Sequence, residues 1–225
     1  MKRLLCIIAV LLLVLRLSTP INAYSNVYKS NERAGKKIAL TFDDGPHPII
    51  TGRILDILER YSVPATFFVV GQNVENYPKA FERLANSGCE IGNHTFSHRN
   101  VGNMSESELL SEIERTERAI EGVSHRHTLL LRPPEGHFGD VVRRVSVVRG
   151  YDIVLWSIDT LDWAHTSADT MAQKVLSSVS CGDIILMHDY TSGGAHTCEA
   201  LEIMIPRLIE MGYEFVTVSE LICEE

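Results

Sequence analysis

The sequence contains no Cys-x-x-Cys pair, the spacing used by many cysteine metal sites. Its five cysteines stand apart, and Cys6 lies in the first 23 residues, which leaves Cys89, Cys181, Cys198 and Cys223. Four cysteines allow three complete disulfide pairings, among which the sequence does not choose. Disulfides are optional, because a domain of about 200 residues buries enough apolar surface to fold without them. Because the Cys-x-x-Cys spacing is missing, we expect no cysteine-bound metal.

Basic residues are fewer than acidic residues. Lysine and arginine number 21 against 29 aspartates and glutamates, so the formal net charge is −8. Such a surface does not suit nucleic acid, because the phosphate backbone requires positive charge. A neutral carbohydrate would be tolerated, whereas a strongly anionic polymer would need local basic residues.

No hydrophobic run is long enough for a membrane span. The apolar stretch Leu4–Leu15 is shorter than the roughly 20 residues that a spanning helix needs. It follows Lys2 and Arg3, and the segment Met1–Ala23 resembles an export signal. Its removal would take the formal net charge from −8 to −11, because three basic residues and no acidic residue go with it. We expect a protein secreted to the cell wall or extracellular face, membrane-anchored only if this segment is retained.

The remaining sequence alternates between strand and helix patterns, with no internal repeat and no long linker. Strands are predicted at 37–42, 65–70, 89–91, 128–131, 153–157, 183–187 and 214–216, and helices at 49–61, 77–87, 105–121, 139–149, 167–178 and 199–211. Ser105 and Glu108 have the spacing of a capping box. The alternation predicts a parallel sheet, open or closed as a barrel, with functional loops at the carboxyl ends of the strands. A polar lead, 24–36, precedes one catalytic domain, 37–225.

Two motifs contain metal-ligand residue types. Residues 41–46 read Thr-Phe-Asp-Asp-Gly-Pro after an apolar run, which places Asp43 and Asp44 at the end of a strand. His94 and His98 are four residues apart, so both imidazoles can face one cation from a helix or a tight loop, with Asp44 as third ligand. Each motif also has a structural interpretation, since an aspartate pair can cap a turn and a histidine pair can bond to backbone.

Three further motifs follow predicted strands. Arg132 begins Arg-Pro-Pro-Glu-Gly, and a guanidinium fixed there would hold Asp43 ionised. Trp163 ends Asp-Thr-Leu-Asp-Trp and would form a flat apolar wall beside a cleft. His188 lies in Leu-Met-His-Asp, directly after the predicted strand 183–187. Taken alone, the Trp163 motif is explained equally well by a structural role, and the Arg132 and His188 motifs are explained better by one. All five motifs fall at strand ends, however, and their joint occurrence favours a functional site. A flexible loop with Gly193-Gly194 lies beside His188.

Thr-Phe-Asp-Asp-Gly, His-Thr-x-x-His, Arg-x-Pro-x-Gly, Asp-x-x-Asp-Trp and Leu-x-His, in this order, resemble the five motifs of the polysaccharide deacetylases, the NodB-homology family of carbohydrate esterases (family 4). The resemblance spans residues 37 to about 222. It implies a distorted (β/α)7 barrel of one domain and metal-assisted removal of acetyl groups from sugars.

The resemblance also implies a role for each motif residue. Asp43 would be the general base, oriented by Arg132, while Asp44, His94 and His98 would hold the metal. Imidazole and carboxylate ligands suit Zn²⁺ and also accept Co²⁺, Ni²⁺ or Mn²⁺.

The remaining motif residues would act on the leaving group and the acetyl group. His188 would be the general acid, tuned by Asp162. The substrate would be lined by Trp163, Leu186, Pro134 and Glu135. Glu135 departs from the family pattern, in which this position often carries an aromatic or other neutral residue. A carboxylate facing the cleft would disfavour anionic substrates and could favour an amine-bearing one.

The predicted activity is N-deacetylation of N-acetylglucosamine units in peptidoglycan or chitin-like polymers, by a monomer. Two alternatives remain at this point. One is O-deacetylation of acetylated xylan, and the other is a carbohydrate-binding relative without catalysis. Relatives of the second kind usually lose a metal ligand, the base or the acid, whereas this sequence retains all of them, namely Asp43, Asp44, His94, His98 and His188.

Overall fold

The computed structural model describes residues 26–191 and 196–223. The predicted export signal and the Gly193-Gly194 loop lie outside these residues. No helix in the described ranges combines the length and apolarity that crossing a membrane requires.

The described residues form one nine-stranded sheet in which all pairings between strands are parallel. The spatial order is β1-β6-β5-β4-β3-β2-β8-β7, with β9 paired to β2. The strands are β1 Val27–Tyr28, β2 Lys37–Asp43, β3 Thr66–Val69, β4 Glu90–Asn93, β5 Leu130–Leu131, β6 Asp152–Val154, β7 Ile158–Asp159, β8 Ile184–His188 and β9 Glu214–Phe215.

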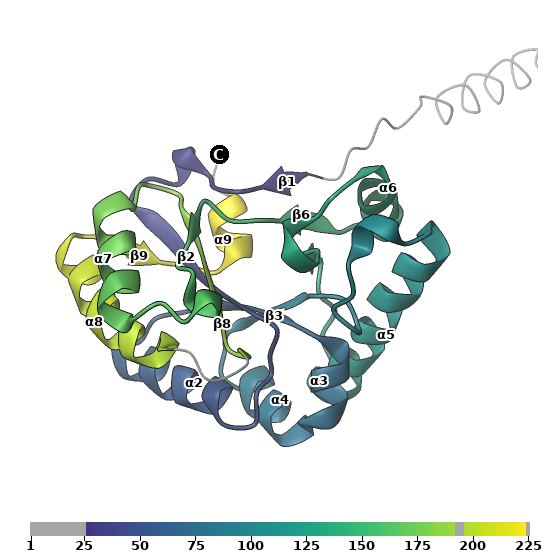
Figure 1. Ribbon diagram of the computed structural model, residues 1–225, viewed down its shortest axis with the longest axis horizontal. Helices are drawn as coiled ribbons and strands as arrows, with labels where there is room; N and C mark the ends of the chain where they lie inside the picture. The colour runs from purple at the N-terminus through teal and green to yellow at the C-terminus, as the bar shows by residue number, and fades with distance from the viewer. Residues whose placement is uncertain (1–25, 192–195, 224–225) are drawn as a thin grey trace, which may run out of the picture.

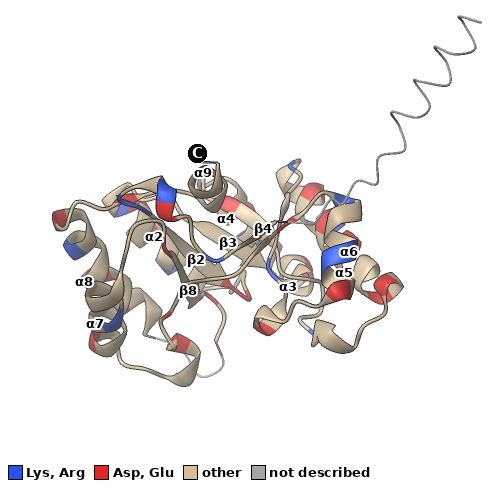
Figure 2. Cartoon of the chain, turned by 90° about the horizontal axis from the view of Figure 1, so that it is seen from above, with Lys and Arg blue, Asp and Glu red and all other residues tan. Residues whose placement is uncertain are grey.

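Helices surround this curled sheet, as Figure 1 shows. They are α2 Ile50–Tyr61, α3 Gly71–Asn76, α4 Pro78–Ala85, α5 Glu106–Ser124, α6 Asp140–Arg149, α7 Ala168–Ser178, α8 Thr197–Glu210 and α9 Val218–Ile222. The capping box predicted for α5 is confirmed, because Ser105 Oγ accepts from Glu108 N and Glu108 Oε2 accepts from Ser105 N. Charged residues lie mainly on the peripheral helices and loops (Figure 2).

The sheet curls into an incompletely closed barrel. Its two end strands, β1 and β7, are not paired with each other in the described residues. Near the amino ends of the strands, however, Ser30 forms an antiparallel bridge with Asp183, and Asn31 N donates to Gly182 O at 2.9 Å. This contact draws the segment after β1 towards β8. The predicted parallel sheet is confirmed in this form.

Strand β2 separates two hydrophobic cores. Because side chains alternate across a strand, Leu40 and Phe42 face the layer under α2 and α8, whereas Ala39 faces the inside of the barrel with Phe68 and Val154. Asp43 has the same parity as Ala39. The alternation therefore directs the Asp43 carboxylate into the barrel at its carboxyl end.

Some elements differ from the sequence-based expectation. The polar lead contributes β1, which pairs with β6, and β7 at Ile158–Asp159 was not expected. Both strands have only two residues, too few to show a period. Helices α3 and α9 also lack a predicted counterpart, since each has only five or six residues.

Candidate functional site

The loop after β2 presents two aspartates in different environments. Asp43 is buried, whereas Asp44 is partly exposed and has a left-handed backbone, with φ of 75°. Gly45 follows, and its peptide bond to Pro46 is cis. A Cβ at Gly45 would lie 2.0 Å from Asp189 Oδ2, so only glycine fits this approach.

A tight turn after β4, rather than a helix, brings the two histidines together. Thr95 and His98 have positive φ values of 65° and 51°. His98 Nε2 lies 3.1 Å and His94 Nε2 3.4 Å from Asp44 Oδ1. The three ligand atoms lie within 4.8 Å of one another. Sequence spacing and structure thus agree on this cluster.

The geometry of this cluster fits a metal ion. With ligand bonds of about 2.0–2.1 Å, tetrahedral geometry separates ligand atoms by about 3.3 Å, close to the two separations observed at Asp44 Oδ1. That oxygen is buried and has no hydrogen-bond partner among the described residues. The carbonyl of Arg132 accepts from His94 Nδ1 at 2.6 Å, which leaves the Nε2 lone pair for the cation. Metal coordination would satisfy the unpaired oxygen.

Glu112 on α5 holds the histidine turn, a role that sequence reasoning missed. Its Oε2 accepts from Phe96 N at 3.0 Å and Ser97 N at 2.7 Å, and Oε1 pairs with Arg99 Nη2 at 3.1 Å. Although burial raises the pKa of Glu112, its bonds to Ser97 and Arg99 outweigh this effect and lower the pKa below its usual value. The available signal was a glutamate on the buried face of α5, next to Leu109 and Ile113.

Arg132 fills the inside of the barrel directly below the cleft. It has no exposed surface, and its guanidinium stacks 4.1 Å from the centre of the Phe68 ring. Nη1 donates to Asp43 Oδ1 at 2.7 Å and Thr41 Oγ1 at 2.8 Å. Nε and Nη2 donate to the carbonyls of Val154 and Leu155. Arg132 therefore fixes the Asp43 carboxylate and supplies its counter-charge.

Removal of this guanidinium should destabilise the fold. We expect Arg132→Met to lower the free energy of unfolding by about 3–5 kcal/mol, because a buried carboxylate loses its partner. Chemical denaturation monitored by circular dichroism measures the change. Arg118→Met is the matched control, since its exposed pair with Glu114 should contribute about 0–1 kcal/mol. Equal losses in the two variants would contradict the assignment.

His188 and Asp162 form a second pair, at the end of β8 next to Asp43. His188 Nδ1 lies 2.8 Å from Asp162 Oδ1, while Asp162 Oδ2 accepts from His188 N and from Thr197 Oγ1. Burial lowers the pKa of His188, but the bond to Asp162 and its charge outweigh burial and, with Asp43 and Asp44, raise the pKa to about 9. The pair with Asp162 thus favours the protonated form of His188.

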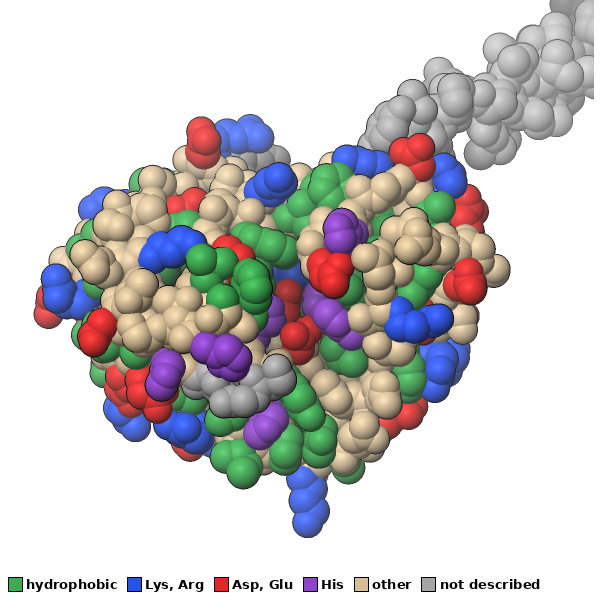
Figure 3. Space-filling model, viewed as in Figure 1, with side chains coloured by type: hydrophobic (Ala, Val, Ile, Leu, Met, Phe, Trp, Pro, Cys, Tyr) green, Lys and Arg blue, Asp and Glu red, His purple; other side chains and the backbone are tan. Residues whose placement is uncertain are grey.

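The four residues predicted to line the substrate differ in exposure. Trp163 is 54% exposed, and its Nε1 lies 3.4 Å from Asp159 Oδ2. Leu186 and Pro134 are buried, whereas the Glu135 side chain is 57% exposed. Figure 3 shows histidine and acidic side chains gathered in a hollow on this face. Beside Asp44 and His98 an open pocket of about 240 Å³ continues towards Tyr190.

Asp189, which follows His188, is another residue that sequence reasoning did not assign. Its carboxylate is buried, accepts from Thr51 Oγ1 at 2.5 Å and has a second oxygen without a partner among the described residues. Burial and the charge of Asp44 raise its pKa to about 7, against the lowering effect of the bond from Thr51. Through this bond Asp189 ties the first turn of α2 to the end of β8.

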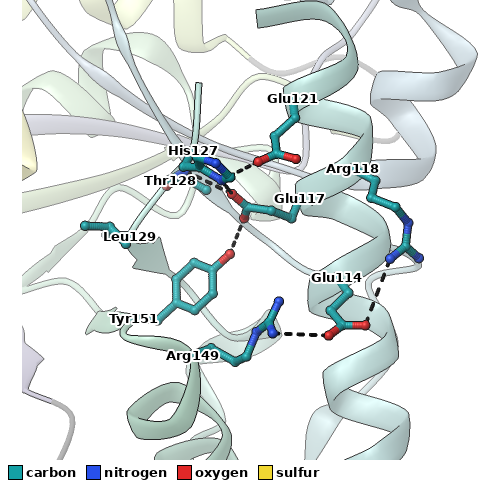
Figure 4. Close-up of a pocket in the computed structure, with 9 residues that line it drawn as sticks. All are labelled: Glu114, Glu117, Arg118, Glu121, His127, Thr128, Leu129, Arg149 and Tyr151. Carbon is teal, nitrogen blue, oxygen red and sulfur yellow. Dashed lines mark hydrogen bonds and ion pairs between the residues drawn. The ribbon is translucent and has the colours of Figure 1, made fainter. Parts of the chain in front are cut away.

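A second group of possible ligands lies away from this cleft, in a pocket of about 350 Å³ (Figure 4). Glu117 and Glu121 lie one turn apart on α5, and the Nδ1 atom of His127 contacts both carboxylates. Glu117 also accepts from Tyr151 OH and from Thr128 N. The polar groups of this second cluster are thus already bonded to one another or to neighbouring residues.

Comparison with known proteins finds deacetylases by family profile, by sequence and by structure. The profile of a family described as polysaccharide deacetylase matches residues 30–154. A peptidoglycan-N-acetylglucosamine deacetylase of Bacillus cereus is 39% identical over 189 residues, covering 83% of this chain and 88% of the relative. The crystal structure of a peptidoglycan N-acetylglucosamine deacetylase has a TM-score of 0.84 at 38% identity, covering 88% of this chain and 92% of that one. This likeness confirms the predicted barrel class.

A pseudoenzyme of carbohydrate esterase family 4 from Bacillus anthracis also has a TM-score of 0.84, at 30% identity, with 90% of this chain and 71% of that chain covered. Since a pseudoenzyme has the same fold, overall likeness does not decide between activity and its loss. Any argument for activity therefore rests on the side chains in the cleft.

Proposed function

The chain belongs to the polysaccharide deacetylase family, a family of hydrolases, and from this premise we propose that it is a secreted, metal-dependent N-deacetylase. Its substrates are N-acetylglucosamine units in peptidoglycan or chitin-like polymers, and acetate is the product. The observation that carries the proposal is the cluster of Asp44, His94 and His98, in which Asp44 Oδ1 has no hydrogen bond among the described residues, with Asp43 and His188 at the neighbouring ends of β2 and β8.

Asp44, His94 and His98 would hold the cation, and their nitrogen and oxygen donors favour Zn²⁺ over harder cations. When bound, the metal would polarise the acetyl carbonyl and lower the pKa of a water molecule. Co²⁺, Ni²⁺ and Mn²⁺ are compatible with the same donors.

Asp43 is proposed as the general base. Its Oδ1 is held by Arg132 at 2.7 Å, whereas Oδ2 lies 3.7 Å from His94 Nε2 and points towards the metal ligands. A carboxylate oriented in this way takes a proton from the attacking water. A backbone N–H near Glu135, in a turn with φ of 58°, would stabilise the oxyanion of the tetrahedral intermediate.

His188 is proposed as the general acid. It lies beside Asp43 in the sheet, where β8 pairs with β2. Protonated and held by Asp162, it gives its proton to the departing sugar nitrogen, since an amide nitrogen leaves poorly as an anion. Trp163, Leu186 and Pro134 would form the walls around the acetyl group and the sugar.

We further propose that Met1–Ala23 directs export and that residues 37–225, with the lead 24–36, act as a monomeric catalytic domain. The formal net charge of −8 supports a neutral or cationic polymer as partner rather than nucleic acid. Peptidoglycan would place the site of action at the cell wall.

Acetate release from N-acetylglucosamine oligomers by residues 24–225, supplied with Zn²⁺, tests the proposal. We expect release by the wild type and a loss of about 10²-fold or more in Asp43→Asn, because proton transfer by a positioned base contributes that much. Acetylated xylan is assayed in parallel. Release from xylan alone would overturn the N-deacetylase assignment in favour of ester hydrolysis, and release from neither would favour a binding protein.

A further inference from the structure

Glu135 places a carboxylate at the rim of the cleft. It belongs to the short 3-10 turn Pro134–Gly136, three residues after Arg132, at the carboxyl end of β5. Its left-handed backbone, with φ of 58°, turns the side chain outward, where 57% of it is exposed. A left-handed backbone is uncommon for a residue other than glycine, so this turn is held by its surroundings.

Two side chains fix the direction of this carboxylate. Asn100 Nδ2 donates to Glu135 Oε2 at 3.2 Å, and His137 Nδ1 lies 3.0 Å from the same oxygen. Within the described ranges no arginine or lysine forms an ion pair with Glu135. The carboxylate is therefore oriented through Oε2, is more than half exposed and, among the described residues, is not paired with an arginine or lysine.

Glu135 lies beside the turn that carries His98. Asn100, two residues after His98, donates from Nδ2 to Glu135 Oε2. Asp159, across the cleft beside Trp163, is less available to a ligand, because it accepts from Leu161 N and lies 3.4 Å from Trp163 Nε1. Among the described residues, Glu135 is thus an exposed acid that a substrate at this rim would meet.

Deacetylation changes the charge of the polymer. An N-acetylglucosamine unit is neutral, whereas the glucosamine unit left after acetate release carries an ammonium group. An oriented carboxylate attracts an ammonium and repels an anionic substituent. We propose that Glu135 binds the ammonium of a glucosamine unit that neighbours the unit being hydrolysed, so that partly deacetylated chains are the preferred substrate. This inference rests on the proposed deacetylase function.

The expected preference is modest. An ion pair in a half-exposed position gains little over its hydration, so we expect about a two- to fivefold effect on binding. It should weaken as salt is added, since an exposed pair is screened within about 10 Å at 0.1 M ionic strength. Each released acetate would make the next unit along the chain a better substrate.

Two N-acetylglucosamine oligomers of equal length test the proposal. One is fully acetylated, and the other has glucosamine on both sides of a single acetylated unit. For the wild type we expect kcat/KM per acetyl group to be about two- to fivefold higher with the second oligomer. In Glu135→Gln the ratio should fall to about 1, since glutamine retains the shape but not the charge.

Glu210→Gln is the matched control. Glu210 is an exposed acid at the carboxyl end of α8, and Met211, which follows it, accepts from Lys36 Nζ just before β2, at the end of the barrel opposite the cleft. This variant removes the same charge and should keep the wild-type ratio. A ratio that Glu135→Gln leaves unchanged would overturn the proposal, as would a wild type that prefers the fully acetylated oligomer.

Binding of a fully deacetylated glucosamine oligomer separates this proposal from the proposed function. Calorimetry should show about two- to fivefold weaker binding by Glu135→Gln than by the wild type at low salt. If no oligomer releases acetate, the proposed function fails, and this titration still decides whether Glu135 binds an ammonium. If acetate is released but binding is equal in the two proteins, only the inference about Glu135 fails.

Discussion

Removal of the metal should abolish acetate release, and Zn²⁺ should restore it. The cation would supply several kcal/mol of transition-state stabilisation that no side chain of the cleft replaces, so the loss should reach about a thousandfold or more. Asp44 Oδ1, buried and without a hydrogen bond among the described residues, lies 3.1 Å and 3.4 Å from two imidazole nitrogens, an arrangement that could hold a cation. The measurement is acetate release after chelation, dialysis and stepwise addition of Zn²⁺, with metal content followed by elemental analysis.

Two histidine variants make this test specific to the site. His98→Ala should raise the Zn²⁺ concentration needed for half-maximal activity by more than about 10-fold, because loss of a hydrogen-bond partner of a metal ligand alone costs about 10–100-fold. His127→Ala removes an exposed histidine from the separate Glu117–Glu121 group and should leave the Zn²⁺ dependence unchanged. Full activity in protein shown to be metal-free would contradict the metal-dependent proposal. The same titration with Co²⁺, Ni²⁺ and Mn²⁺ would rank the alternative cations.

The five motifs could be located in the sequence because each follows a strand. A strand of apolar residues such as Ile38–Leu40 has a clear end, and in a parallel sheet all carboxyl ends meet at one side. Asp43, Arg132 and His188 could therefore be placed at one cleft from sequence order alone. The pairing of β2 with β8 then fixed how closely they approach.

The supporting residues could not be located in this way. Glu112 lies on a helix, 15 residues from Ser97, and nothing in its local pattern shows that its carboxylate reaches back to the histidine turn. Thr41 looks like an ordinary strand residue until the barrel closes and Arg132 donates to its hydroxyl. Asp189 bonds to Thr51, 138 residues away. These contacts depend on tertiary packing, which local periodicity does not encode.

Replacement of the histidine at the end of β8 should separate amide from ester hydrolysis. We expect His188→Asn to lower kcat on N-acetylglucosamine oligomers by about 10²–10⁴-fold, because proton transfer to the leaving nitrogen is lost. An ester leaves as an alcohol or alkoxide and depends less on the acid, so any activity on acetylated xylan should fall much less. Equal losses on the two substrates would argue that His188 does not act as the acid.

The pH profile of the wild type provides an independent measure of the same group. Against the lowering effect of burial, Asp162 makes the largest contribution that raises the pKa of His188 to about 9. The acid form of His188 is therefore complete at low pH and disappears as the pH rises through this pKa. A bound cation offsets the contributions of Asp43 and Asp44, so the basic limb of kcat should fall between the ordinary histidine value of about 6.5 and about 9. Asp162→Asn removes the largest contribution that raises this pKa and should shift the limb to lower pH. A basic limb that stays in place in Asp162→Asn would assign that ionisation to another group. A shift of the limb to lower pH, together with the loss of activity in His188→Asn, would identify the proton donor as the His188–Asp162 pair.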